Sequence, residues 1–241
     1  MCIRDRHNWC RPLIDNSKDF IIKDGRHSVV EKTIFKKSLN AFVPNDCSLS
    51  TNEHLWLITG PNMAGKSTFL RQNAHIIILA QIGSYVPAKQ AKIGITSKLF
   101  SRIGASDNIS KGQSTFMVEM LETSNIIKNA DDKSFIILDE IGRGTSTFDG
   151  LAIAWAIIEK VLRSNKSRTL FATHYHELTE IEKTNSKVKN VSCEIKEWND
   201  EIIYSYKVVE GKSKGSLGIK VAELAGFPGD VIVEALSLIH I

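Results

Sequence analysis

A short glycine-rich segment carries the residues best suited to binding phosphate groups. Residues 60–67 read GPNMAGKS and fit the pattern G-x-x-x-x-G-K-[ST]. Glycines let backbone N–H groups turn toward phosphate oxygens, and the positive end of a following helix adds to that attraction. Lys66 supplies a cation for the β and γ phosphates of a nucleotide, and the Ser67 hydroxyl can bind Mg²⁺. The pattern predicts a phosphate-binding loop, and the alternative is a plain glycine turn with a solvated lysine.

Two further positions could complete phosphate chemistry. Asp139 and Glu140 follow the apolar run 135–138, which places one carboxylate near Mg²⁺ and the other where an attacking water could lose its proton. Acidic residues at a strand end are also common in solvated turns, so the phosphate loop upstream is what favours catalysis. His174 follows the apolar run 169–173, and a neutral imidazole there could bind the γ-phosphate. A histidine in an ordinary loop is the alternative.

Short apolar strands alternating with helices must position these residues. The sequence predicts a buried strand, a loop and a buried helix around the glycines, and strand and helix alternate again downstream. This alternation predicts an α/β fold with a mostly parallel sheet flanked by helices. The strands are expected at 54–59, 135–138 and 169–173, and the helices at 68–82 and 150–163.

Other segments predict additional structure around this unit. Residues 20–31 and 42–49 are β-rich and are expected to form short strands before the main sheet. Residues 191–196 and 202–209 are expected to form an antiparallel hairpin at one edge. Residues 220–225 and 228–235 suggest two short helices around Gly226.

Composition sets the broad class of the chain. Hydrophobic residues make up 42% of it and charged residues 24%, which is typical of a packed globular domain. The net charge of +4 comes from dispersed residues and does not by itself indicate nucleic-acid binding. The cysteines show no metal-ligand spacing and are expected to be free thiols, which favours the cytoplasm; they are Cys2, Cys10, Cys47 and Cys193. No apolar run is long enough to span a membrane.

The two ends read differently from the rest. Residues 1–6 and 236–241 resemble translated adapter sequence, so we expect them to be non-native; ordinary frayed termini are the alternative.

Several longer motifs make the sequence similar to the MutS family of DNA mismatch-repair proteins. They occur in the family's order, and further segments at 25–31, 42–46 and 215–228 resemble the flanks of the same domain. Ser28 and Leu217 depart from the family pattern, which puts the fit of two of those flanking segments in doubt. The main motifs are TGPNMAGKSTFLRQ (59–72), QIGSYVPA (81–88), STFMVEM (114–120), LDEIGRGTSTFDG (138–150) and FATHYHELT (171–179).

The resemblance implies an ATPase of the ABC type, in which two domains dimerise and each completes the other's nucleotide site. ATP and Mg²⁺ would be the cofactors. Lys66, Glu140 as general base and His174 as γ-phosphate sensor would be catalytic, and Ser67 and Asp139 would hold the metal. Ser114 would reach the partner's γ-phosphate, and Arg143, Thr145 and Ser146 would form the loop through which the sites communicate. The nucleotide would contact Phe42, Gly60, Pro61, Asn62, Met63, Ala64, Gly65, Lys66, Ser67 and Thr68.

The resemblance also implies an organisation and partners. Residues 8–212 would form the ATPase domain and residues 213–235 a partial helix-turn-helix dimerisation element. The partners would be a second copy of the domain, a MutL-type repair protein, and mismatched double-stranded DNA contacted through segments of the full-length protein. A bacterial-type, DNA-associated cytoplasmic protein is expected.

Two other functions compete with this interpretation. A transporter motor of the ABC type would be expected to carry an LSGGQ-like signature, whereas this chain reads KGQSTFM at 111–117. The isolated chain could also be a nucleotide-gated interaction module with little turnover of its own, because a composite site needs a dimer.

Overall fold

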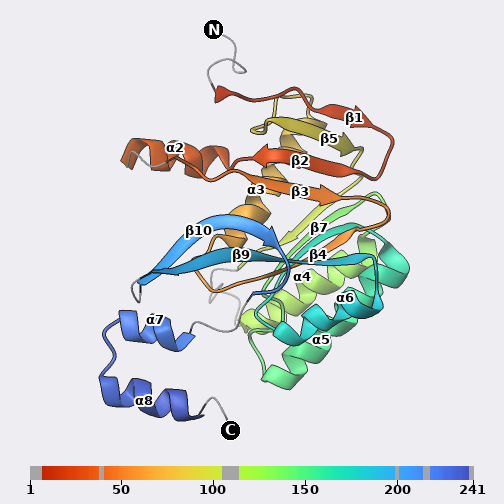
Figure 1. Ribbon diagram of the computed structural model, residues 1–241. Coiled ribbons are helices and arrows are strands. Elements are labelled where there is room, and N and C mark those ends of the chain that lie inside the picture. Colours follow the sequence, from red (N-terminus) through yellow and green to blue (C-terminus); the bar gives the residue numbers. More distant parts are fainter. Residues whose placement is uncertain (1–6, 38–40, 105–113, 199–200, 214–217, 239–241) are drawn as a thin grey trace.

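The computed structural model describes residues 7–37, 41–104, 114–198, 201–213 and 218–238, which form an α/β fold with two sheets (Figure 1). The strands are β1 Leu13–Asp15, β2 Phe20–Gly25, β3 Asn45–Leu49, β4 Leu55–Thr59, β5 Gln90–Gly94, β6 Leu99–Arg102, β7 Phe135–Asp139, β8 Arg168–Ala172, β9 Val188–Trp198 and β10 Glu201–Glu210. The α-helices are α2 Ser28–Lys37, α3 Lys66–Gln81, α4 Thr115–Asn129, α5 Thr147–Lys160, α6 Ile181–Thr184, α7 Gly218–Leu224 and α8 Gly229–Leu238.

The larger sheet has the strand order β10-β9-β4-β8-β7-β6. All neighbours in it are parallel except β9 and β10, which form an antiparallel hairpin at one edge. In the register of its central strands, Leu57 of β4 lies opposite Phe171 of β8. The parallel order brings the ends of β4, β7 and β8 to the same edge, and the residues predicted to do chemistry follow those ends.

The smaller sheet has the order β1-β5-β2-β3. Strand β2 pairs antiparallel with both β3 and β5, while β1 pairs parallel with β5. Helix α3 lies between the two sheets, since its buried residues share one core cluster with residues of both.

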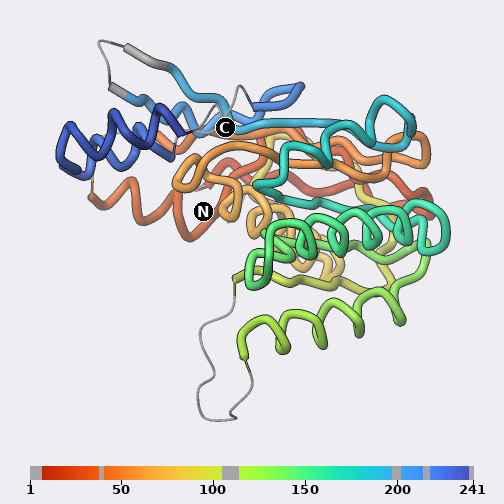
Figure 2. Tube along the Cα trace, turned by 90° about the horizontal axis from the view of Figure 1, so that it is seen from below, coloured from red at the N-terminus to blue at the C-terminus, as the bar shows by residue number. Residues whose placement is uncertain are grey.

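Successive side chains of the central strands alternate between the two faces of the sheet and pack in two separate hydrophobic clusters. In β4, Trp56 and Ile58 pack in the cluster with α3, while Leu55 and Leu57 pack in the cluster with α5. A strand that is buried on both faces has a continuous apolar sequence, as β4 does with the residues LWLIT. Helices α4, α5 and α6 gather on the second face, whereas α7 and α8 lie at another end of the molecule (Figures 1 and 2).

Most of the expected elements are confirmed, with shifted ends. The predicted hairpin is β9 and β10, and the two predicted C-terminal helices are α7 and α8, the second of which continues to Leu238. The predicted helix 150–163 begins earlier, as α5 from Thr147, and continues into a π-helical turn over Val161–Asn165. No helix in the described ranges is long and apolar enough to cross a membrane.

The prediction of β structure through residue 31 is wrong, because α2 begins at Ser28. The ring Nδ1 of His27 accepts from the N–H of Val30 at 3.4 Å, and the N–H of Glu31 donates to the His27 carbonyl. Glu31 also places a negative charge in the first turn, where it interacts favourably with the positive end of the helix dipole. The β-branched pair Val29 and Val30 was the misleading signal, and it is overridden by these local contacts.

The thiols behave as expected. Cys10, Cys47 and Cys193 are free, and burial raises the pKa of each of them. Cys2 lies outside the described residues. The second β-rich prediction is confirmed only from Asn45, since residues 42–44 precede β3.

Candidate functional site

The predicted phosphate loop lies between the end of β4 and the start of α3, and two of its glycines have backbone conformations that other residues rarely adopt. Gly60 has a φ of +129° and Gly65 a φ of +101°. A Cβ atom on Gly60 would also lie 3.3 Å from Cβ of Cys193. Gly65 directly precedes α3, and no side chain caps that helix start. The turn therefore leaves the positive end of α3 free to face an anion.

The side chain of Lys66 crosses this loop and is nearly buried, with 5% of it exposed. Its Nζ donates hydrogen bonds to the carbonyl oxygens of Gly60 at 2.5 Å and of Pro61 at 3.0 Å. It also lies 3.6 Å from Oε1 of Glu140. The ammonium group is thus held inside the loop, where it can meet an anion that the loop binds.

Ser67 and Asp139 come together, as the sequence predicts for a metal site. The Ser67 hydroxyl donates to Oδ2 of Asp139 at 2.7 Å. The other oxygen, Oδ1, is buried and has no hydrogen-bond partner among the described residues. Burial raises the pKa of Asp139, and the nearby charge of Glu140 acts in the same direction, while the Ser67 hydrogen bond opposes both.

This pair fits Mg²⁺, which prefers oxygen ligands and keeps several waters or substrate oxygens. The unpartnered Oδ1 of Asp139 is a buried acceptor that a cation would satisfy. Among the described residues, no three His, Cys, Asp or Glu side chains cluster as a metal cage. Phosphate oxygens or water would therefore have to supply the remaining ligands.

Glu140 follows β7 in a left-handed conformation, with a φ of 54°, which is uncommon for a residue other than glycine. Its N–H donates to the carbonyl of Ala172 at 3.0 Å, which ties the turn to β8. Its carboxylate binds Arg143 at 2.7 Å through Oε2 and faces Lys66 through Oε1. The strained turn directs the carboxylate toward the phosphate loop and away from the sheet.

His174 lies at the end of β8, close enough to the same charges to feel them. Its ring centroid is 4.1 Å from that of Tyr175. The pKa of His174 is lowered mainly by partial burial; Glu140 acts to raise it, and Arg143 and Lys66 to lower it. A histidine with a lowered pKa is neutral at pH 7, which matches the expected form for a hydrogen bond to phosphate.

A buried polar network behind the site was not predicted from the sequence. The N–H of Gly142 donates to Oε1 of Glu119 at 2.7 Å, and the hydroxyl of Tyr175 donates to the Gly142 carbonyl at 2.9 Å. Oε2 of Glu119 lies 3.3 Å from Arg102. This network connects α4 to the turn that holds Glu140. Its members are far apart in the sequence, so spacing gave no signal.

The predicted communication loop is the segment between β7 and α5. Arg143 and Ser146 are exposed and Thr145 is half-buried. Ser146 caps α5 by accepting from the N–H of Asp149, while Arg143 binds Glu140. The loop is therefore attached to the site at one end and to a helix start at the other. Its role between two sites stays a prediction.

Ser114 is not brought to the other site residues within this chain. It is exposed and caps α4, where its hydroxyl accepts from the N–H of Met117 at 3.2 Å. Within the described part of the chain, no hydrogen bond joins it to the glycine loop or to Glu140. Its predicted action on a second copy stays a prediction.

A cavity of about 670 Å³ adjoins the loop and contains Phe42, as expected for the residue placed near an adenine ring. Aromatic and apolar side chains dominate its wall, among them Tyr204 and Tyr206 from β10 and Val30 and Ile34 from α2. A second hollow of about 310 Å³ holds Lys66, Ser67 and Glu140. The two share Met63, Gly65 and Thr68, so one ligand could extend from the aromatic cavity into the loop.

The residues predicted to contact the nucleotide lie in different places relative to these two hollows. Phe42 lines the aromatic cavity, and Pro61 and Asn62 line the loop hollow. Gly60 and Ala64 line neither; the Ala64 side chain is buried, so only its backbone can face a ligand.

Sequence reasoning missed Tyr206, whose ring reaches the glycine loop. A Cβ on Gly65 would lie 3.4 Å from Cδ1 of Tyr206. A register shift in the hairpin gives Tyr206 a φ of 54°, and Asn45 holds the bulge by donating to its carbonyl and accepting from Val208. The spacing of Tyr204 and Tyr206 would have suggested a shared strand face, but not that this face meets the loop.

Comparison with known proteins agrees with the motifs. Residues 56–240 match the family described as MutS domain V. A DNA mismatch repair protein MutS of Ruegeria sp. (strain TM1040) is 53% identical over 96% of this chain and 27% of its own length. Those of Thermodesulfovibrio yellowstonii and Orientia tsutsugamushi (strain Boryong) are 53% and 54% identical over 99% and 98% of this chain, and over 28% and 26% of their own lengths. The chain thus spans about a quarter of the relatives it matches.

Proposed function

The chain belongs to the MutS family of DNA mismatch-repair proteins, and on that premise we propose that its glycine-loop site binds ATP with Mg²⁺ and hydrolyses it. One observation carries the proposal. The aromatic cavity and the loop hollow adjoin, sharing Met63, Gly65 and Thr68, and the hollow contains Ser67, whose partner Asp139 has an unpartnered buried carboxylate oxygen. That combination suits a purine, a polyphosphate chain and a divalent cation in one ligand.

The base would occupy the aromatic cavity. Phe42, Tyr204 and Tyr206 offer ring surfaces, which gain free energy from stacking and from burial of apolar area. The phosphates would lie in the loop hollow, where N–H groups at the start of α3 and the ammonium of Lys66 meet their charge. Nζ of Lys66, which donates to the carbonyls of Gly60 and Pro61, would turn toward these phosphates.

The metal ligands on the protein side would be Ser67 and Asp139. A bound Mg²⁺ would neutralise charge that develops on the phosphate oxygens. Asp139 would exchange its hydrogen bond from Ser67 for contact with the cation. Since burial raises the pKa of Asp139 in the absence of a cation, this carboxylate gains more from metal than an exposed one would.

Glu140 would act as general base toward the attacking water. Its side chain is 19% exposed, and its carboxylate lies between Arg143 and Lys66. Binding of phosphate would engage Lys66 and leave Oε1 of Glu140 free to accept a proton. His174, kept neutral by its lowered pKa, would hydrogen-bond the γ-phosphate and report its presence.

For the whole protein we propose that ATP binding is coupled to clamping on mismatched double-stranded DNA. The partners would be a second copy of the domain, which supplies Ser114 in trans, and a MutL-type repair protein. Ser114 is exposed at the start of α4 and forms no hydrogen bond to the glycine loop within the described residues, which supports a role toward another molecule. The same observation favours the alternative that the isolated chain is a nucleotide-gated module with little turnover.

Enzyme dilution tests the proposal and separates these alternatives. ATP affinity is measured by equilibrium binding, and specific ATPase activity is measured across protein concentration. The proposal predicts ATP binding that Lys66→Ala removes, and specific activity that rises with concentration because a composite site needs two chains. Binding without concentration-dependent turnover would favour the gated module, and absence of ATP binding would refute the proposal.

A further inference from the structure

A third hollow, of about 250 Å³, lies at the opposite pole of the large sheet. It adjoins the points where β4 and β8 begin, whereas the glycine loop follows the end of β4. Five residues of strand separate the two ends of β4, a distance of about 17 Å. Residues from four segments of the chain line this hollow, here called the basal pocket: Lys18, Ser50, Thr51, His54, Leu162, Lys166, Arg168 and Lys187.

Positive charge dominates the basal pocket. Lys18, Lys166, Lys187 and Arg168 line it, and no acidic side chain does. Lys18 pairs with Asp132 at 2.6 Å, but Lys166 and Lys187 form no ion pair with any described residue. Lys187 instead reaches the Thr51 carbonyl at 3.4 Å. Among the described residues, Lys166 and Lys187 therefore lie at the pocket without the carboxylates that would normally neutralise them.

Two buried polar atoms of the pocket lack partners among the described residues. His54 is 6% exposed and its Nε2 makes no hydrogen bond, and Arg168 is 1% exposed and its Nε makes none. A buried donor or acceptor without a partner costs free energy, so such atoms usually indicate a ligand or water. Burial lowers the pKa of His54, and a backbone hydrogen bond with Thr51 opposes this effect. The charges of three lysines that line the same pocket, Lys187, Lys18 and Lys166, lower it further.

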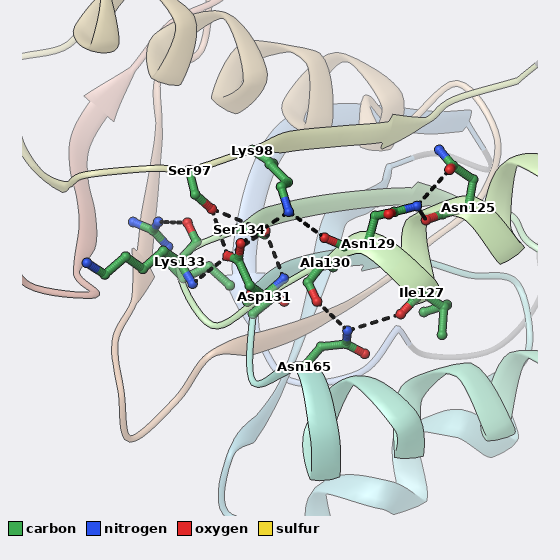
Figure 3. A network of polar contacts seen from close by, with 12 residues as sticks. Ser97, Lys98, Asn125, Ile127, Asn129, Ala130, Asp131, Lys133, Ser134 and Asn165 are labelled. Atoms are coloured by element: carbon green, nitrogen blue, oxygen red, sulfur yellow. Dashed lines mark hydrogen bonds and ion pairs between the residues drawn. The ribbon is translucent and has the colours of Figure 1, made fainter.

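The wall carrying Lys166 and Arg168 is anchored by hydrogen bonds to neighbouring segments. Next to Lys166, the amide of Asn165 donates to the carbonyls of Ile127 and Ala130 (Figure 3). The Ser167 hydroxyl donates to the Asp131 carbonyl at 2.7 Å. The guanidinium of Arg168 donates to several backbone carbonyls, including that of Gly94 at 3.2 Å. A pocket with fixed walls loses little entropy when it binds a small ligand.

We propose that the basal pocket binds one phosphate group. Its volume is below the range of about 300–1,000 Å³ typical for drug-sized ligands, which favours a single oxyanion over a whole nucleotide. Lys166 and Lys187 supply the compensating charge, and the hydroxyls of Ser50 and Thr51 supply neutral donors. A phosphate carries both acceptor oxygens and, when monoprotonated, an O–H donor, so it can satisfy Nε2 of His54 in either protonation state.

Amide NMR of the full chain tests this, with inorganic phosphate as the probe and chloride at matched ionic strength as the reference. Phosphate should shift the amides of Thr51 and Ser167 saturably, with half-saturation at or below about 10 mM. The paired substitution of Lys166→Gln with Lys187→Gln should weaken that binding about tenfold or more. Lys89→Gln removes one exposed positive charge that does not line the pocket, and should leave it unchanged.

The glycine loop provides an internal reference. Phosphate bound there shifts Gly65, and Lys66→Ala should remove that response while the basal response persists. A parallel titration with short duplex DNA identifies the source of the group: shifts at Thr51 with free phosphate alone indicate a soluble oxyanion, and shifts with DNA as well indicate backbone phosphate. Shifts that stay linear with phosphate, or that survive the double substitution, would overturn the proposal.

Discussion

Replacing Glu119 with glutamine should destabilise the protein by about 3 kcal/mol, because the change leaves the buried Arg102 cation without its buried charge partner. Glu119 and Arg102 are 10% and 6% exposed in their side chains, and their closest atoms lie 3.3 Å apart. Glutamine keeps an oxygen for the N–H of Gly142 but removes the charge. Breaking such a pair from one side costs about 3–5 kcal/mol, and we take the low end because Glu122 also lies 3.0 Å from Nε of Arg102.

The expected change in melting temperature follows from chain length. At roughly 2–4 °C per kcal/mol for a domain of this size, the loss corresponds to about 6–12 °C. Urea unfolding followed by circular dichroism gives the free energy directly. Glu122→Gln is the matched control, because Glu122 is 49% exposed and its ion pair should contribute at most about 1 kcal/mol.

A double substitution separates charge burial from packing. Glutamine at Glu119 together with leucine at Arg102 removes both charges and keeps an oxygen for the N–H of Gly142, so this pair should recover most of the stability that Glu119→Gln loses. The reasoning is refuted if Glu119→Gln stays within about 1 kcal/mol of the parent, or if it costs no more than Glu122→Gln.

Three further predictions concern other parts of the molecule. Gly150→Ala should cost about 3 kcal/mol in chemical unfolding, since a Cβ there would lie 2.2 Å from the Tyr175 hydroxyl; an unchanged midpoint would contradict this close packing. Asp131 has its pKa lowered from 3.8 to about 2, first by the Ser97 hydrogen bond. It therefore stabilises the fold above pH 3.8, and the stability deficit of Asp131→Asn should shrink as the pH falls from 3.8 toward 2; a constant deficit would count against it. Tyr206→Ala should weaken ATP binding about tenfold, whereas Ile203→Ala, an exposed neighbour on β10 outside the cavity, should not; equal effects in equilibrium binding would remove Tyr206 from the base site.

Local pattern predicted the centre of the fold well. The apolar runs that became β4, β7 and β8 are buried on both faces, so their continuous hydrophobicity marked them directly. Glycine spacing located the loop because Gly60 and Gly65 must adopt positive φ values. Both features depend on residues that are close together along the chain, so a single sequence is enough to show them.

Features that depend on distant contacts were missed or misread. Tyr206 meets the loop only through a hairpin bulge held by Asn45, which is more than 150 positions earlier in the chain. Glu119 joins Gly142 across two elements. These contacts cannot be predicted from sequence patterns, because each joins segments that are far apart along the chain.

The site residues divide in the same way. Proximity of Lys66, Ser67, Asp139 and Glu140 could be predicted, because parallel strands bring their ends to one edge. The roles assigned to them, and to His174 and Ser114, stay predictions.

Single-turnover hydrolysis by Glu140→Gln, compared with ATP affinity of the same variant, tests the central claim most directly. Glutamine keeps the size of the side chain but cannot accept the proton of an attacking water. We expect Glu140→Gln to keep the parental ATP affinity and to slow hydrolysis by about 100-fold or more. Hydrolysis at the parental rate by a variant that binds ATP normally would contradict the assignment of this site as a hydrolytic centre with Glu140 as its base.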